Sequence, residues 1–275
     1  MGSAAIALWS AAVGLWKDNA VAKPAAVLGR AEVLTRYRHL REISKQHHSA
    51  ALDFLSKDAV ISQARRLGLA QGKTLVLDSM DDLNLAFDLA IHTAPKDRSR
   101  AIDRYARAAR LAPESDEALV LEAMRRARFS IISFERRHAV AGLIVKDLFR
   151  GVDVWLVDEG LESSLSEGAA LATRLYHPEG FAMTAGVLVP LDIELIEDAI
   201  ADTPQLLGNR REGLIDDRRF AEAIYRVALA SGSMGRSLTR IRFPRRDDVG
   251  APYDKRVPCG SIWKSSLGKK PGATN

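Results

Sequence analysis

The spacing of apolar residues predicts helices throughout the first half of the chain. The first predicted helix covers Ala25–Leu55, where Leu34, Tyr37 and Leu40 recur at intervals of three or four residues. This is the period of one helix face. Four further helices are predicted over Lys57–Leu67, Asp81–His92, Ser99–Leu111 and Ser115–Ala127.

Cap and breaker residues support two of these helices. Ser56 is placed to cap the helix that starts at Lys57, and Gly68 is placed to stop it. Ser79 followed by Asp82 resembles a capping arrangement for the helix over Asp81–His92. The apolar run Thr74–Leu77 lies between the two helices and predicts a short strand or a packed connector.

After Arg128 the pattern changes to short runs rich in β-branched and aromatic residues. The predicted strands are Arg128–Arg136, Ala141–Asp147, Val152–Asp158, Ala169–Tyr176 and Gly180–Val189. Most gaps between them hold turn residues such as Arg150-Gly151 and Glu159-Gly160. Five short strands at this spacing predict a small antiparallel barrel or sandwich. Two more helices are predicted over Asp192–Ala201 and Asp216–Ala230.

The predicted fold class is therefore α+β. It combines a helical N-terminal half, a small five-stranded antiparallel barrel or sandwich, C-terminal helices and a basic irregular tail. The predicted segments are an apolar N-terminal segment over 1–24, a helical domain over 25–127, a small β barrel over 128–191, C-terminal helices packing on the body over 192–231, and a flexible basic tail over 232–275.

Charge is distributed unevenly along the 275 residues. The formal net charge is +5, from 40 basic and 35 acidic residues. Residues 236–275 hold ten basic and three acidic residues, which gives +7, whereas residues 1–235 carry −2. A basic tail on a nearly neutral body is typical of a polyanion contact, and a solvated end that aids solubility is the alternative.

The tail supplies the candidate residues for contact with nucleic acid or an acidic partner. Its basic residues offer phosphate contacts, and three aromatic residues among them, Phe243, Tyr253 and Trp263, offer stacking. These candidates are Arg236, Arg240, Arg242, Arg245, Arg246, Lys255, Arg256, Trp263, Lys264, Lys269 and Lys270.

The first sixteen residues contain no charged side chain. They lack the basic start of a secretory signal, and the apolar run is too short to span a bilayer. We expect an apolar helix that packs on the body or docks on a protein partner through Trp9 and Trp16. A signal peptide and a mis-assigned start codon are the alternatives. No membrane span is predicted elsewhere, and a cytoplasmic location is expected.

Catalytic motifs are incomplete, so no catalytic residue, cofactor or metal site is predicted. Gly68–Thr74 has one residue too few between its glycines for a phosphate-binding loop, and it follows a helix rather than a strand. His47-His48 are expected as a surface pair. His92 is expected at the end of a helix, where a partial positive charge on its ring suits the helix dipole. Cys259 is the single cysteine and lies in the tail.

The segment Phe134–Leu191 carries an order of elements with a known counterpart. Gly142–Leu148, Arg150-Gly151 and Val154–Glu159 follow one another as strand, turn and strand. This order is similar to that of certain uncharacterised bacterial proteins, in which a helical N-terminal part precedes a small β-barrel. Some of them end in a SEC-C motif, a cysteine-rich zinc element.

The tail sequence Val-Pro-Cys-Gly-Ser at 257–261 is similar to half of the SEC-C motif. The other zinc-binding cysteines are absent. Structural zinc takes four N or S ligands, so the resemblance implies a degenerate motif that holds no metal. It brings no known activity with it.

The sequence favours a non-enzymatic binding or adaptor protein that contacts nucleic acid or an acidic partner through the basic tail. One alternative is a protein–protein interaction module that docks through the apolar N-terminal helix. The other is an enzyme whose site is assembled from distant residues, which a pocket with several perturbed titratable groups would reveal. By composition its candidate residues are Asp81, Asp82, Asp88 and His92.

Overall fold

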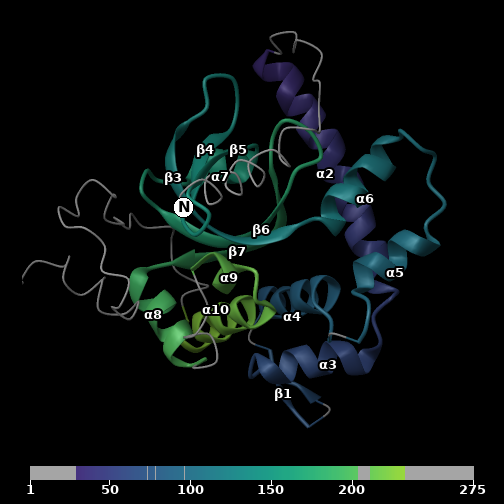
Figure 1. The fold of residues 1–275 in the computed structure, drawn as a ribbon, viewed down its shortest axis with the longest axis vertical. Coiled ribbons are helices and arrows are strands. Elements are labelled where there is room, and N and C mark those ends of the chain that lie inside the picture. The colour runs from purple at the N-terminus through teal and green to yellow at the C-terminus, as the bar shows by residue number, and fades with distance from the viewer. Residues whose placement is uncertain (1–28, 73, 78, 96, 204–210, 233–275) are drawn as a thin grey trace, which may run out of the picture.

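Helices and one antiparallel sheet make up the part of the chain that the structure describes (Figure 1). The structure is a computed structural model, and it describes residues 29–72, 74–77, 79–95, 97–203 and 211–232. The predicted N-terminal segment and the basic tail therefore lie outside the described residues.

The first half is helical, as predicted. Its elements are α2 (Arg30–Leu52), α3 (Lys57–Arg66), α4 (Met80–His92), α5 (Ala101–Ala108) and α6 (Asp116–Arg125), with the hairpin β1 (Ala70–Gln71) and β2 (Thr74–Leu75) between α3 and α4. The predicted caps are confirmed: the Ser56 hydroxyl accepts a hydrogen bond from the Ala59 amide at 3.2 Å. The Ser79 amide donates to the Asp82 carboxylate at 3.0 Å.

The second half contains the five predicted strands. They are β3 (Arg128–Arg137), β4 (Leu143–Asp147), β5 (Val152–Leu156), β6 (Ala170–Tyr176) and β7 (Met183–Leu191). All neighbours pair antiparallel in the order β5-β4-β3-β6-β7. The sheet curls until its two edges meet at one point, where Leu156 and Ala182 form a single parallel bridge. The Val157 amide donates to the Ala182 carbonyl there at 3.0 Å.

One local prediction is wrong. Glu159-Gly160, expected as a turn, begins the short helix α7 (Glu159–Ser164). The Asp158 carboxylate starts this helix by accepting from the Leu161 amide at 3.1 Å. The helix predicted over 216–230 is confirmed as α10 (Arg218–Ala230), and a short helix that was not predicted, α9 (Arg211–Ile215), precedes it. The remaining helix, α8 (Ile193–Ala201), matches its prediction.

Helices cover one face of the sheet, while its other face is filled from within the curl. Phe129 and Ile131 of β3 belong to the cluster that packs the sheet against α3, α4, α8, α9 and α10. On the opposite face, Ile132 and Phe134 pack with Leu161 of α7. Helices α2, α5 and α6 share a third cluster with the end of the sheet (Figure 1). The predicted α+β class with its helical N-terminal half is confirmed.

Within the described residues, no helix is long and apolar enough to span a membrane.

Candidate anion-binding surface

A basic surface is built on α5 and the segments beside it. The helix buries Ala101 and Ile102 against the neighbouring helices. Three arginines, Arg100, Arg104 and Arg107, are spaced by four and then three residues, so they lie along one side of the helix. Arg98 precedes this stripe and Arg110 follows it, and both are exposed. We call these five arginines the α5 arginine surface.

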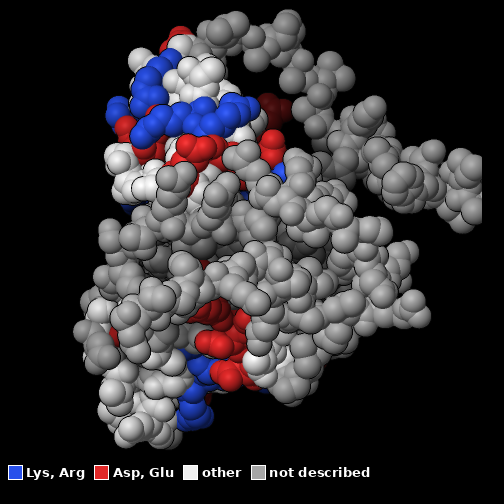
Figure 2. Space-filling model, turned by 90° about the vertical axis from the view of Figure 1, so that its left-hand side faces the viewer, with Lys and Arg blue, Asp and Glu red and all other residues white. Residues whose placement is uncertain are grey.

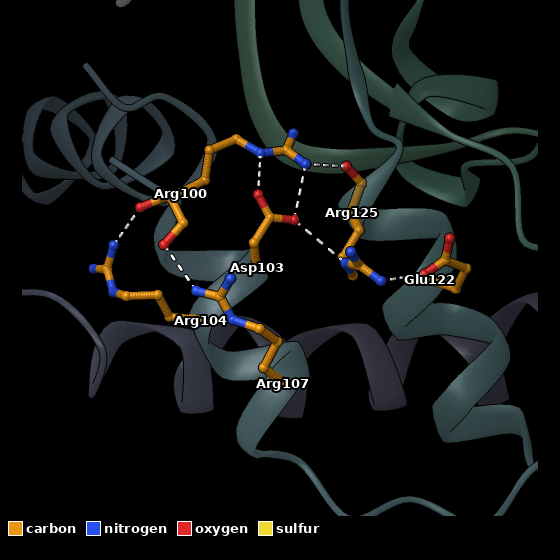
Figure 3. A network of polar contacts seen from close by, with 7 residues as sticks. Arg100, Asp103, Arg104, Arg107, Glu122 and Arg125 are labelled. Atoms are coloured by element: carbon orange, nitrogen blue, oxygen red, sulfur yellow. Dashed lines mark hydrogen bonds and ion pairs between the residues drawn. The ribbon is translucent and has the colours of Figure 1, made fainter. Parts of the chain in front are cut away.

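An ion-pair network fixes one end of this surface to α6 (Figure 3). Arg100 donates from Nε and Nη2 to both carboxylate oxygens of Asp103, at 2.7 and 3.0 Å. Arg125 reaches Asp103 at 3.3 Å and Glu122 at 2.7 Å. Burial alone would raise the pKa of Asp103, but the hydrogen bonds and charges of the two arginines outweigh it and lower that pKa. Asp103 therefore stays ionised and joins the two helices.

The other four arginines of the surface have no carboxylate within ion-pair distance in the described part of the chain. Arg104 donates to the backbone carbonyls of Ser99 and Phe54. Arg107 donates to the Ser99 hydroxyl at 2.8 Å. Arg98 and Arg110 are exposed. In Figure 3 no dashed line joins Arg104 or Arg107 to either acidic residue. Four positive charges on a short segment therefore lack a neutralising partner among the described residues.

Many other exposed arginines of the described chain are paired. Arg30 contacts Glu162 at 2.8 Å, and Arg38 contacts Glu159 at 2.6 Å. Figure 2 shows the side of the molecule that lies on the left in Figure 1, where Lys and Arg side chains lie directly beside Asp and Glu side chains. The α5 arginine surface lies on the other side, because α5 and α6 are on the right in Figure 1. The four arginines of the α5 arginine surface that have no carboxylate partner in the described chain lie close together in the sequence, within residues 98–110.

A second polar cluster lies inside the fold, centred on Asp88 of α4. Arg174 of β6 donates from Nε and Nη2 to the two carboxylate oxygens, at 2.9 and 3.0 Å. The Tyr225 hydroxyl of α10 donates to Oδ2 at 3.0 Å. All three side chains are buried. Burial would raise the pKa of Asp88, but the Arg174 charge and these hydrogen bonds lower it, so a buried ion pair joins three elements.

The predictions for two histidines are wrong. His92 does not stand at an open helix end: it is buried, and neither ring nitrogen has a hydrogen-bond partner among the described residues. Burial, then the nearby Arg174 charge, holds the pKa of His92 well below its ordinary value, so the ring is neutral. His47 is also buried and contacts the Tyr105 hydroxyl and the Glu117 carbonyl, each at 2.8 Å. Only its neighbour His48 is partly exposed.

The structure brings together two of the four candidate residues for an enzyme. Asp88 and His92 lie one turn apart on α4, whereas Asp81 and Asp82 lie at its start, where Asp82 belongs to the helix cap. Two hollows in the described surface are lined by residues other than Asp88, Arg174, Tyr225 and His92. One, of about 480 Å³, is lined by Ala31, Glu32, Thr35, Arg36 and His39, and the other, of about 320 Å³, by Leu52, Leu55, Lys57, Val60, Ile61, Leu75 and Phe87. The side chains of the Asp88 cluster are hydrogen-bonded to one another.

The candidates for binding a nucleic acid or a protein partner that were predicted from the sequence lie outside the described residues. This holds for the tail residues Arg236–Lys270 and for Trp9 and Trp16. Sequence reasoning missed the α5 arginine surface because the net charge of the body is close to zero. A shorter window reveals it: Lys96–Arg110 holds six basic and two acidic residues.

The comparisons with known proteins identify a family but no activity. No curated protein and no solved structure matches the chain. The sequence model of a family of unknown function, DUF7986, matches residues 31–227, which include α5, α6 and the whole Asp88 cluster. Because this match covers more than half of the chain, the protein belongs to the DUF7986 family of unknown function.

Proposed function

We propose that the protein binds nucleic acid, and that the α5 arginine surface contacts the phosphate backbone. The observation that carries this proposal is that Arg98, Arg104, Arg107 and Arg110 have no carboxylate partner in the described chain. A guanidinium group presents a planar fork of donors that matches a phosphate group. Arginines that neutralise phosphates release condensed counterions, which makes affinity fall steeply with salt.

The proposal extends to the basic tail over residues 236–275, as a second contact along the same polyanion. Two basic segments joined to one body raise the local concentration of each for the same strand. The sequence at 257–261 is similar to half of a SEC-C motif, and because the other zinc-binding cysteines are absent we expect it to hold no metal. The bacterial origin and the cytoplasmic location expected from the sequence stay predictions.

The experiment is fluorescence anisotropy of the full chain with labelled single-stranded RNA and with duplex DNA, over a series of salt concentrations. The test variant replaces Arg98, Arg107 and Arg110 by Gln. Arg104 is left in place because it also holds two backbone carbonyls. A matched control replaces three exposed arginines that have carboxylate partners, namely Arg30, Arg38 and Arg219. Both variants lose three positive charges.

Binding to phosphate predicts a difference between these two variants. Each phosphate contact contributes about 0.7 to the salt slope for a single strand and about 0.9 for duplex DNA. The test variant should therefore bind more weakly, with a salt slope smaller by about two for a single strand and by nearly three for duplex DNA, and the control should bind like the unmodified chain. An equal loss of affinity in both variants would mean that only net charge matters, and it would refute the proposal that the α5 arginine surface contacts phosphate.

A third variant tests the tail in the full chain, with Arg240, Arg242, Arg245 and Arg246 replaced by Gln. If this variant alone loses binding, the tail is the contact and the α5 surface is not. No binding of either nucleic acid by the unmodified chain at low salt would refute the proposal and point to an acidic protein partner.

A further inference from the structure

An apolar groove lies between the end of α2, α3, β2 and α4. It is the hollow of about 320 Å³ lined by Leu52, Leu55, Lys57, Val60, Ile61, Leu75 and Phe87. Six of these seven residues are apolar, and each of the six is only partly buried. Val76, which follows β2, is 50% exposed. An exposed apolar concavity with one charged residue is typical of a docking surface.

The chain contains a segment whose chemistry matches the groove. Residues 1–16 carry no charged side chain and include two tryptophans, Trp9 and Trp16. These residues lie outside the described part of the chain. A segment without charged side chains can enter an apolar groove without burying a charge of its own. The groove contributes one charged residue, Lys57, whose long side chain can keep its ammonium group in water.

The segment can reach the groove of its own molecule. The groove lies at the C-terminal end of α2, and the 23 residues of this helix cover about 35 Å at 1.5 Å per residue. Residues 17–28 connect the apolar segment to the start of α2, and a chain of this length spans up to about 40 Å when extended. The connection is therefore long enough to run beside α2.

We propose that residues 1–16 dock into this groove of the same molecule, with Trp9 and Trp16 as the anchoring side chains. Residues 17–28, which include charged positions such as Lys17 and Asp18, would then run along the outside of the body. Burial of large aromatic side chains supplies most of the energy of such contacts. This assignment gives the apolar segment a role within the fold. The alternative occupants of the groove are a second copy of the chain and a protein partner.

The experiment uses contact quenching of a bimane label by tryptophan in the full chain. The label is attached to Lys57→Cys at the rim of the groove, in a chain whose single native cysteine is removed by Cys259→Ser. A second label position, Arg126→Cys at the exposed residue that follows α6, serves as the control. Each labelled chain is compared with the same chain carrying Trp9→Leu and Trp16→Leu.

Docking predicts strong quenching at position 57 that is lost when the two tryptophans are replaced, with no such change at position 126. Ile61→Asp, in the groove, should abolish the quenching, whereas Ser62→Asp, on the same helix but outside the lining, should leave it unchanged. Far-UV circular dichroism checks that both variants are folded.

Three results would overturn the proposal. One is quenching that does not depend on Trp9 and Trp16, and another is quenching that survives Ile61→Asp in a folded chain. The third is quenching that appears only when labelled chains without Trp9 and Trp16 are mixed with unlabelled chains, since a second copy would then occupy the groove.

Discussion

The buried pair between Asp88 and Arg174 offers a direct test of the packing of the fold. The exposed fractions of the two side chains are 3% and 7%, and the carboxylate receives donors at 2.9 and 3.0 Å from the guanidinium. Arg174→Met keeps most of the side-chain volume but removes the charge. It leaves the Asp88 carboxylate with the Tyr225 hydroxyl and no buried cation.

Removing one partner of a buried ion pair typically costs about 3–5 kcal/mol, because the other charge is left without compensation. We expect Arg174→Met to lower the free energy of unfolding by this amount at pH 7. In the variant the pKa of Asp88 should rise above its unfolded value, so the folded chain takes up a proton more readily. The difference from the unmodified chain should therefore shrink as the pH falls from 7 to 5.

The measurement is urea unfolding followed by circular dichroism, at pH 7 and pH 5. The double variant Asp88→Leu/Arg174→Met removes both charges and should recover at least half of the loss, because no unpaired charge then remains. Arg38→Met is the matched control at an exposed pair, whose side chains are 62% and 38% exposed, and should destabilise the fold far less than Arg174→Met. A cost of less than about 1 kcal/mol for Arg174→Met would refute the burial of the pair.

Three further predictions concern single positions. Because burial keeps His92 neutral in the folded chain while the unfolded chain binds a proton below about pH 6.5, stability falls with decreasing pH, and His92→Leu should remove up to about 1.4 kcal/mol per pH unit of that fall. Urea unfolding between pH 7 and pH 5 measures this, and an unchanged pH dependence would contradict it. Gly142→Ala should destabilise the fold by about 1–3 kcal/mol more than Gly151→Ala in thermal unfolding. Both glycines have positive φ, but only at Gly142 would a Cβ lie 2.3 Å from a carbonyl oxygen, that of Leu156. An equal loss of stability in the two variants would show that the backbone relaxes to relieve this contact. Ser56→Ala should cost about 1 kcal/mol by the same measurement, through loss of the cap of α3, and no cost would mean that the cap is replaced by solvent.

The elements that the sequence predicted correctly have local signals. Ser56 and Ser79 precede their helices by one residue, and their side chains cap the backbone as expected. The strand runs are likewise visible in consecutive residues. By contrast, α7 was missed because Glu159-Gly160 resembles a turn, while the Asp158 carboxylate that caps this helix also accepts a hydrogen bond from Thr184, 26 residues away.

The candidate site was harder to predict for the same physical reason. His92 ends an amphipathic pattern, and nothing near it in the sequence indicates that α4 is covered at this end. Arg174 pairs with Asp88 across 86 residues, and Tyr225 joins them across 137. Such contacts depend on the tertiary arrangement of α4, β6 and α10. The α5 arginine surface was also missed, but it does not depend on such distant contacts. Its charge lies within one short window of sequence, so a local count of charged residues would have found it.

The order of the strands has a consequence for the kinetics of folding. The pairs β3–β4, β4–β5 and β6–β7 each join neighbours in the chain, so they close short loops and can form early. The pair β3–β6 must bring together strands separated by residues 138–169, and the Leu156–Ala182 bridge then joins the outer edges. Closing a longer loop costs more chain entropy, and this cost arises before the contacts between the strands can offset it. The rate of folding should therefore be set by the docking of the β6–β7 hairpin onto β3, with the bridge between the edges forming last.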